Sequence, residues 1–421
     1  MRFDTIALHE GYKPDTDTHA RAVPIYATTA YAFDDVDHAR DLFNLEREGN
    51  IYSRLGNPTC EVLEKRVAAL EGGVGALATA SGHAAIHMTF MNLLCSGDEI
   101  VSASNLYGGT VNLFGKSFAR LGIKVNFVDQ KNPASFEAAV NEHTKAFYIE
   151  TVGNPNADLC DVEAIAAIAH RHGVPLIVDN TVATPALIRP IEYGADIVIH
   201  STTKYLSGNG SVMGGMVVDS GRFPWKGNAR FPLYNDPDPS YHGVVFADVA
   251  NNAGFIARLR ALILRDYGAC QSPFNAWVTL NGMETLSLRM RRHCDNALAV
   301  ARWLEASDKV ESVSYPTLPS SPYYELAQKY LPDGASATFT FVIKGGREAG
   351  AKFINALKLV SHVANLGDSR TLVSHPATTT HSQLTDEQLR ACDIEPGTVR
   401  LSVGIEDIAD ILEDLEQAMN A

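Results

Sequence analysis

The fold is decided by two short stretches, VPLIVDN (174–180) and ADIVIHSTTK (195–204). Each contains a run of Val and Ile without the apolar–polar alternation of a half-buried strand, and each ends in polar residues. Such runs are typical of strands that are buried on both faces, as in a parallel sheet. The two stretches therefore predict neighbouring strands inside an α/β domain.

Similar runs occur elsewhere in the first half of the chain, at 98–103, 123–129, 145–150 and 214–219. Helix candidates separate them. Asp161 can cap a helix that Gly173 ends, and the apolar face of that helix would consist of Val162, Ile165, Ala166 and Ala169. Repetition of strand, helix and strand predicts an α/β fold with a mainly parallel, seven-stranded type of sheet covered on both sides.

Three regions are expected along the chain. Residues 1–60 are turn-rich and polar, which indicates an arm that packs on another body. Residues 61–268 would form a large domain, in which 221–243 is a long loop and 244–268 a long helix. Residues 269–421 would form a smaller α/β domain. Its expected strands are 337–344, 359–364 and 398–405, and its expected helices lie near 284–306, 348–358 and 406–419.

Composition narrows the classes of protein. The 421 residues are 46% hydrophobic, which excludes wholesale disorder. Lys and Arg total 35 against 49 Asp and Glu, a net charge of −14. That charge argues against nucleic acid and against an anionic membrane as the main partner. No apolar run approaches the roughly 20 residues of a membrane helix, and the first residues do not resemble a signal peptide. We therefore expect a cytoplasmic protein.

The six cysteines are scattered and form no CxxC pair, so free thiols are expected rather than disulfides or zinc ligands. They are Cys60, Cys95, Cys160, Cys270, Cys294 and Cys392. Three histidines, His83, His375 and His381, have no carboxylate or cysteine partner at metal-site spacing. We therefore expect no metal.

Asp179 and Lys204 follow the two deciding strands. Ligands of open α/β sheets bind at the carboxyl ends of the strands, so both side chains would face one crevice. Pyridoxal phosphate (PLP) requires such a pair, because the lysine forms a Schiff base and the carboxylate keeps the pyridine nitrogen protonated. Ser201 and Thr203 could then bind the phosphate. By spacing alone, an ordinary surface ion pair remains the alternative.

Ser81 and Gly82 precede a helix candidate and offer a second phosphate site. Backbone amides at a helix N-terminus bind anions, and glycine lets a phosphate approach closely. A plain strand-to-helix turn is the alternative. Gly208 and Gly210 do not have the G-x-G-x-x-G spacing of a dinucleotide loop, which disfavours a nicotinamide-dependent oxidoreductase.

Taken together in order and spacing, nine stretches resemble the Cys/Met-metabolism PLP enzymes, a family of fold type I (aminotransferase-like). The resemblance covers nearly the whole chain. The stretches are YSRLGNPT (52–59), LEKRVAALEGG (63–73), ATASGHAA (78–85), NLYGGT (105–110), ETVGNP (150–155), VDNT (178–181), HSTTKYLSG (200–208), HPATTTHSQ (375–383) and VRLSVGIED (399–407).

The resemblance implies roles for residues around the cofactor ring. Lys204 is similar to the Schiff-base lysine and Asp179 to the partner of the pyridine nitrogen. Thr181 stands where the family has a small residue against the ring. Tyr107 resembles the tyrosine stacked on the ring, which orients it and assists proton transfer.

The resemblance also implies residues for the phosphate and the substrate. Phosphate ligands would be Ser81, Gly82, Ser201 and Thr203, joined by Tyr52 and Arg54 from a neighbouring subunit. His83 replaces the commoner Met after Ser-Gly, and the backbone contact should survive that change. Asn154 and Arg400 would hold the substrate's α-carboxylate, with Tyr52 nearby. Shared sites imply an obligate homodimer, usually paired into a homotetramer.

Within the family, the chain resembles the O-acetylhomoserine sulfhydrylases. PDPSYHG (237–243) and the stretch 365–383 match that subgroup. Residues 367–370 read Gly-Asp-Ser-Arg where lyases and cystathionine γ-synthases have Gly-Gly-x-Glu-Ser-Leu, and Gly109 stands where methionine γ-lyases have Cys. The implied reaction is a γ-replacement on O-acetyl-L-homoserine by sulfide or methanethiol, a step of methionine biosynthesis.

Three questions stay open at this level: the reaction, the acyl group and the thiol, which could be sulfide, methanethiol or a carrier-bound sulfur. The alternative reaction is that of a γ-lyase or a cystathionine γ-synthase acting on cystathionine, methionine or O-succinylhomoserine. The acyl group of the substrate, acetyl or succinyl, is also undecided. A succinyl tail would need an extra cation near the site, for which Arg370 is the candidate.

Overall fold

The computed structural model describes residues 1–421 apart from 45, 380–381, 383–384 and 391–393. Its larger sheet has seven strands in the order β1-β7-β6-β5-β4-β2-β3. β7 runs antiparallel to both of its neighbours, and the other pairs are parallel. The mainly parallel sheet is thereby confirmed. The strands are β1 Gly75–Thr79, β2 Glu99–Ala103, β3 Lys124–Val128, β4 Thr144–Glu150, β5 Leu176–Asp179, β6 Ile197–His200 and β7 Gly215–Asp219.

Helices cover this sheet. Three consecutive residues of β5, Leu176, Ile177 and Val178, are fully buried, so both faces of the strand are covered. Helix α7 (Val162–Arg171) packs beside β5, and the Asp161 side chain caps it by accepting a hydrogen bond from the backbone N–H of Ala164 (3.3 Å). The predicted apolar face of α7 is buried. At the β1 edge of the sheet, α3 (Pro58–Glu71) packs on β1. Helix α4 (Gly82–Met91) packs on β1 and on the next two strands, β7 and β6.

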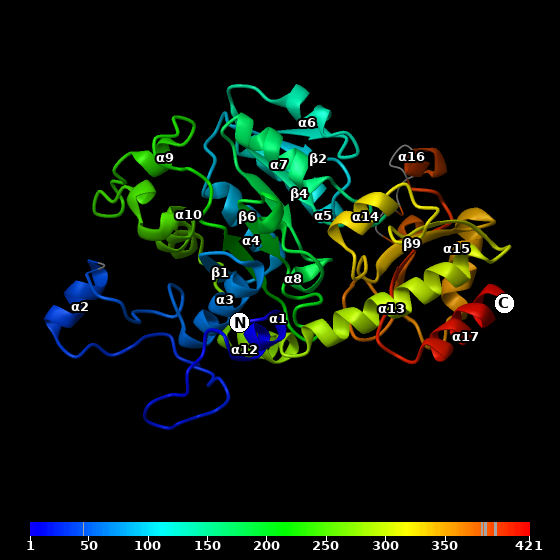
Figure 1. Cartoon of the computed structure of the whole chain (residues 1–421), viewed down its shortest axis with the longest axis horizontal. Helices are drawn as coiled ribbons and strands as arrows, with labels where there is room; N and C mark the ends of the chain where they lie inside the picture. The colour runs from blue at the N-terminus through cyan, green and yellow to red at the C-terminus, as the bar shows by residue number, and fades with distance from the viewer. Residues whose placement is uncertain (45, 380–381, 383–384, 391–393) are drawn as a thin grey trace.

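A second, five-stranded sheet follows in the order β10-β11-β12-β9-β8. Figure 1 shows it beside the first sheet, with the long helix α13 (Leu286–Glu305) extending from one to the other. Helices α15 (Gly346–Ala356) and α17 (Ile408–Met419) lie near the expected positions. The strands are β8 Val310–Ser314, β9 Thr338–Ile343, β10 Ser361–His362, β11 Leu372–Ser374 and β12 Thr398–Ser402.

Sequence patterns missed two of these strands and overextended a third. β8 has an exposed Glu and Ser in its middle, and β11 is only three residues long, so neither forms a recognisable apolar run. The expected strand 359–364 shrinks to the two residues of β10.

The long helix expected over 244–268 is wrong over its first ten residues. Helix α10 begins only at Gly254 and continues through a π-helical turn into α11, which ends at Tyr267. Upstream, Asn251 and Asn252 adopt left-handed backbone conformations, with φ of 58° and 54°. Asparagine tolerates this region, and it is incompatible with a continuing right-handed helix.

The N-terminal region projects from the rest of the chain in Figure 1. It carries α1 (Phe3–His9), which packs on α3, and α2 (Val36–Phe43) at the end of a long irregular segment. Several of its apolar side chains are exposed, among them Phe33, Val36 and Phe43. Across the described part of the chain, no helix is both long and apolar enough to span a bilayer.

The loop 221–243 is anchored by an aromatic cluster that the sequence analysis did not anticipate. Trp225 is fully buried and stacks on Tyr234 with ring centroids 4.4 Å apart and an angle of 18°. Phe223, Phe231 and Phe255 surround it. This packing holds the segment, which contains the short helix α9 (Pro232–Asn235), against Phe255 of α10.

We therefore expect Trp225→Ala to lower the free energy of unfolding by about 3–5 kcal/mol, because it removes a buried aromatic side chain and leaves a cavity. Denaturant unfolding followed by fluorescence or circular dichroism measures this. The matched control is the adjacent Lys226→Ala. Its side chain is 78% exposed, so a change within about 0.5 kcal/mol is expected. Equal losses in both variants would contradict the anchoring role.

Candidate active site

Lys204 lies in the turn that follows β6 and is largely buried. Its Nζ donates a hydrogen bond to Asn365 Oδ1 (2.6 Å), a residue of the segment between β10 and β11. Burial, together with the positive charge of Arg400, lowers the pKa of Lys204 to about 8. A lysine with such a pKa holds much more of its neutral, nucleophilic form near neutral pH than an exposed one.

Asp179 is the last residue of β5 and lies on the strand next to β6. Its Oδ1 accepts a hydrogen bond from the backbone N–H of Thr181 (2.9 Å), and its Oδ2 accepts one from the Tyr148 hydroxyl (3.4 Å). Burial raises the pKa of Asp179, while hydrogen bonds from Thr181 and the proximity of His200 oppose the rise. Thr181 Oγ1 in turn accepts from the backbone N–H of Ser201 (2.7 Å), which ties the ends of β5 and β6 together.

The N-terminus of α4 meets the turn after β6. Ser81 caps this helix, with its Oγ accepting from the backbone N–H of Ala84 (3.1 Å). Gly82 lies so close to Ser201 that a Cβ on Gly82 would stand 2.7 Å from Ser201 Cβ. The Thr203 hydroxyl instead donates to the Gly214 carbonyl (3.2 Å) and accepts from its N–H (3.1 Å).

Tyr107 stands at the N-terminus of α5 (Gly108–Asn112), and 48% of it is exposed. Its ring meets the His83 ring edge to face, with centroids 5.6 Å apart. A Cβ on Gly109 would lie 2.6 Å from Tyr107 Cε1 and 2.8 Å from His83 Cε1, so a side chain there would displace one of the two rings. Below the ring, the backbone N–H of Tyr107 donates to Glu150 Oε1 (2.8 Å), at the end of β4.

Arg400 reaches the site from the second sheet. It belongs to β12, and its Nη1 donates to Asn154 Oδ1 (3.2 Å) while its Nη2 donates to the Asn365 carbonyl (3.1 Å). Burial lowers the pKa of Arg400 from its ordinary value, yet a guanidinium remains protonated at neutral pH. Asn365 therefore bridges Lys204 and Arg400, one through its side chain and the other through its backbone.

Tyr52 and Arg54 lie elsewhere, on the N-terminal region. The Arg54 guanidinium lies over the Tyr52 ring at 5.4 Å, and 41% of Tyr52 is exposed. In the described ranges, no hydrogen bond or ion pair joins either residue to Lys204 or Asp179 of the same chain. One chain therefore assembles the other expected groups without these two.

Three features of the site were not predicted from the sequence: Asn365, Glu150 and the packing of His83 on Tyr107. The sequence does contain signals for Asn365 and Glu150. Asn365 opens the stretch 365–383 and Glu150 opens ETVGNP, both of which matched the family, and polar residues at strand ends are natural site candidates.

Other expected features are placed as follows. Arg370 is 72% exposed and lies 3.4 Å from the Asp368 carboxylate. His375 is buried and hydrogen-bonds Thr378 and the Pro396 carbonyl. Within the described residues, no group of three His, Cys, Asp or Glu side chains could hold a metal ion. Five cysteines are free thiols. Cys392 and His381 lie outside the described residues.

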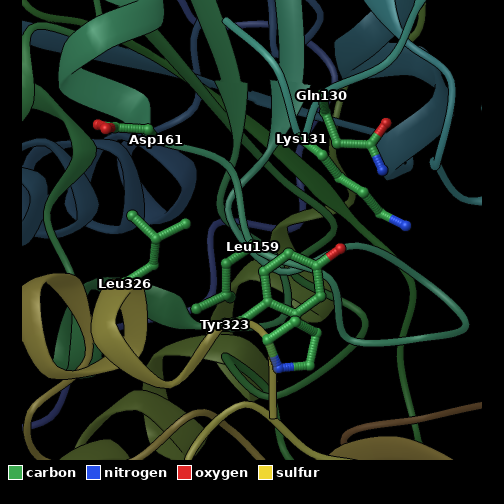
Figure 2. A pocket seen from close by; sticks show the side chains of 7 residues that line it. Gln130, Lys131, Leu159, Asp161, Tyr323 and Leu326 are labelled. Atoms are coloured by element: carbon green, nitrogen blue, oxygen red, sulfur yellow. The ribbon is translucent and has the colours of Figure 1, made fainter.

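A cavity of about 240 Å³ lies apart from this cluster. Figure 2 shows Gln130 and Lys131 on one side of it and Tyr323 and Leu326, from the second half of the chain, on the other. None of the expected site residues lines it. Its lining consists of Gln130, Lys131, Leu159, Asp161, Pro322, Tyr323 and Leu326.

The donor set around Lys204 fits pyridoxal phosphate. An amine with a lowered pKa suits the aldehyde, and a partly buried carboxylate suits the pyridine nitrogen. Hydroxyls and a helix N-terminus suit the phosphate. Gly82 supports the fit, because any side chain there would fill the space between the helix and Ser201.

Comparison with known proteins also indicates a pyridoxal phosphate enzyme. The family model described as Cys/Met metabolism PLP-dependent enzyme matches residues 4–420. An O-acetyl-L-homoserine sulfhydrylase of Leptospira meyeri is 52% identical, with 99% of this chain and 96% of that protein covered. A homocysteine synthase of Schizosaccharomyces pombe is 50% identical, with 99% and 98% covered.

A solved structure from Campylobacter jejuni, which contains N'-pyridoxyl-lysine-5'-monophosphate, has a TM-score of 0.96 at 40% identity, with both chains covered completely. The expected fold class and the expected cofactor are thereby confirmed. Because the family model spans nearly the entire chain, this protein belongs to the Cys/Met metabolism family of PLP-dependent enzymes.

Proposed function

We propose that this protein catalyses a γ-replacement in which sulfide displaces acetate from O-acetyl-L-homoserine and gives L-homocysteine. Methanethiol would be a second acceptor and would give methionine. Relatives of about half identity over the full length are named for this activity. The observation that carries the proposal is the bridge by Asn365, which brings an amine of lowered pKa next to a partly buried guanidinium.

Pyridoxal phosphate supplies an electron sink for the electron pair left at Cα when its proton is removed. Lys204 and Asp179 would hold its aldehyde carbon and its pyridine nitrogen. Thr181 and Tyr107 would contact the ring. Ser81, Gly82, Ser201 and Thr203 would bind the phosphate.

The substrate would be oriented by its α-carboxylate. Arg400 and Asn154 lie within hydrogen-bond distance of each other and together offer donors in the fork geometry that suits a carboxylate. Lys204 Nζ would then take the proton from Cα and carry protons at Cβ, so that the Cγ–O bond breaks, acetate leaves and sulfide bonds to Cγ. Its low pKa, caused mainly by burial, keeps the neutral amine available for that work.

We propose an acetyl rather than a succinyl ester. Arg370 was the candidate for binding a succinyl carboxylate, and it lies largely in solvent with Asp368 beside it. An exposed guanidinium with a carboxylate neighbour gains little from a second anion.

We also propose a homodimer, paired into a homotetramer, that acts in the cytoplasm. In this arrangement Tyr52 and Arg54 would reach the phosphate and the substrate of a second copy's site. The exposure of Tyr52 and of the apolar side chains of the N-terminal region supports a covering partner.

A substrate panel tests the reaction. Homocysteine should form from O-acetylhomoserine only when sulfide is present, and turnover with O-succinylhomoserine should be at least about tenfold lower. Cystathionine and methionine should release no oxo acid. Homocysteine and oxo acid are measured separately. Release of oxo acid without sulfide would contradict the proposal and indicate a γ-lyase, while equal use of the succinyl ester would indicate a synthase-like specificity.

Replacing the proposed Schiff-base lysine should abolish both cofactor attachment and turnover. We expect Lys204→Ala to lose the visible absorption of the bound cofactor and at least about 10³-fold in kcat, because no other amine can substitute. The matched control is Lys329→Ala on α14 (Tyr324–Tyr330), where the lysine pairs with Glu163 at the surface. Normal activity of Lys204→Ala would refute the assignment.

The pH dependence of cofactor attachment tests the environment of Lys204. In the cofactor-free enzyme, the neutral amine is the reactive form, so the rate of covalent attachment should rise with pH and reach half its maximum near pH 8. Arg400→Met removes a neighbouring positive charge and should shift this midpoint upward. A midpoint near that of a free lysine, or a downward shift in Arg400→Met, would contradict the structure.

A further inference from the structure

Two fully buried polar side chains lie at the carboxyl ends of β5 and β6, adjacent in sequence to proposed cofactor ligands, and a third hydrogen-bonds both of them. Asn180 follows Asp179, and His200 precedes Ser201. The third is Glu71, the last residue of α3. All three of these polar side chains have no exposed surface, and the reaction proposed above does not use them.

A single carboxylate oxygen joins this group. Glu71 Oε1 accepts hydrogen bonds from His200 Nε2 (2.7 Å) and from Asn180 Nδ2 (2.9 Å). Asn180 Oδ1 accepts in turn from the Thr151 hydroxyl (3.0 Å), and the Thr151 backbone N–H donates to the Asp179 carbonyl (3.0 Å). Glu71 thus connects the ends of β5 and β6 directly, and the residue after β4 through Asn180.

This network is a costly way to fill a core. Burying a carboxylate and an imidazole requires both to be desolvated, and apolar residues of similar volume are often as stabilising or more so. Two of its polar atoms, Glu71 Oε2 and His200 Nδ1, have no hydrogen-bond partner among the described residues. Stability alone therefore does not account for the group.

The position of this network explains why these polar side chains are buried there. Asp179 would bind one end of the cofactor and Ser201 the other, so the distance between the ends of β5 and β6 sets how well both fit. We propose that Glu71 is a positioning residue for pyridoxal phosphate. Through Asn180 and His200 it holds Asp179 and Ser201 at the separation that the ring nitrogen and the phosphate require. This inference rests on the proposed roles of those two ligands.

The chain contains a matched control at the opposite ends of the same strands. Asp196 precedes β6, and its Oδ2 accepts from His170 Nε2 (2.8 Å) and from the backbone N–H of Leu176 (2.8 Å), the first residue of β5. Asp196 is 2% exposed. It is therefore another buried carboxylate paired with a histidine and joining the same two strands, away from the cofactor ligands.

The test compares Glu71→Ala, Glu71→Gln and Asp196→Asn. The dissociation constant of pyridoxal phosphate, the visible absorption band of the bound cofactor and the melting temperature are measured for each. Glu71→Ala should raise the dissociation constant roughly tenfold, the effect of two lost hydrogen bonds, and alter the band. Glu71→Gln keeps an oxygen that accepts from His200 and Asn180, and should recover most of the affinity. Asp196→Asn should lower the melting temperature and leave the dissociation constant and the band unchanged.

Two results would overturn the inference. One is a folded Glu71→Ala variant with an unchanged dissociation constant and band. The other is an equal loss of affinity in Asp196→Asn, which would indicate a general effect on folding. If Glu71→Ala does not fold, Glu71→Asp takes its place, because the shorter carboxylate cannot reach both donors and should also weaken binding. If the wild-type chain itself shows no cofactor band, the proposed function fails instead.

Discussion

The hydrogen bond from Lys204 to Asn365 joins the two sheets at the site, and the other contacts of the site depend on the packing that permits it. Gly367 makes that packing possible. Its φ is 74°, and a Cβ on it would lie 2.7 Å from the backbone nitrogen of Tyr205. Only glycine meets both conditions without strain. The close approach buries the Lys204 amine, and that burial is the main cause of its lowered pKa.

The charged groups around the site form one pair of cations and one pair of carboxyls, although the chain as a whole has a net charge of −14. Lys204 and Arg400 are neighbouring, partly buried cations, and their repulsion contributes to the low lysine pKa. Asp179 and Glu150 are register partners at the ends of β5 and β4, and burial raises the pKa of both carboxyls. The cations suit an anionic substrate, and the carboxylates suit a protonated ring nitrogen and the backbone N–H of Tyr107.

Most of the large sheet could be predicted because its strands are continuous apolar runs and its helices have caps. The run 174–180 became β5, and Asp161 caps α7 as expected. Failures had local causes. The prediction of one helix over 244–268 did not take account of two asparagines that have left-handed backbone conformations. Strands β8 and β11 were missed because neither has an apolar pattern that a local rule detects.

The sequence by itself determined the fold class and the cofactor, since these depend on patterns and motifs along the chain, and it predicted the residues that would bind that cofactor. Only the tertiary structure decided how they are held. It showed that Asn365 bridges Lys204 and Arg400, and that Glu71 joins Asn180 and His200. Apart from the contact between Asn365 and Arg400, these contacts link residues more than 100 positions apart. Hydrogen-bond partners at such separations follow from how helices and sheets pack, which no local pattern of residue types records.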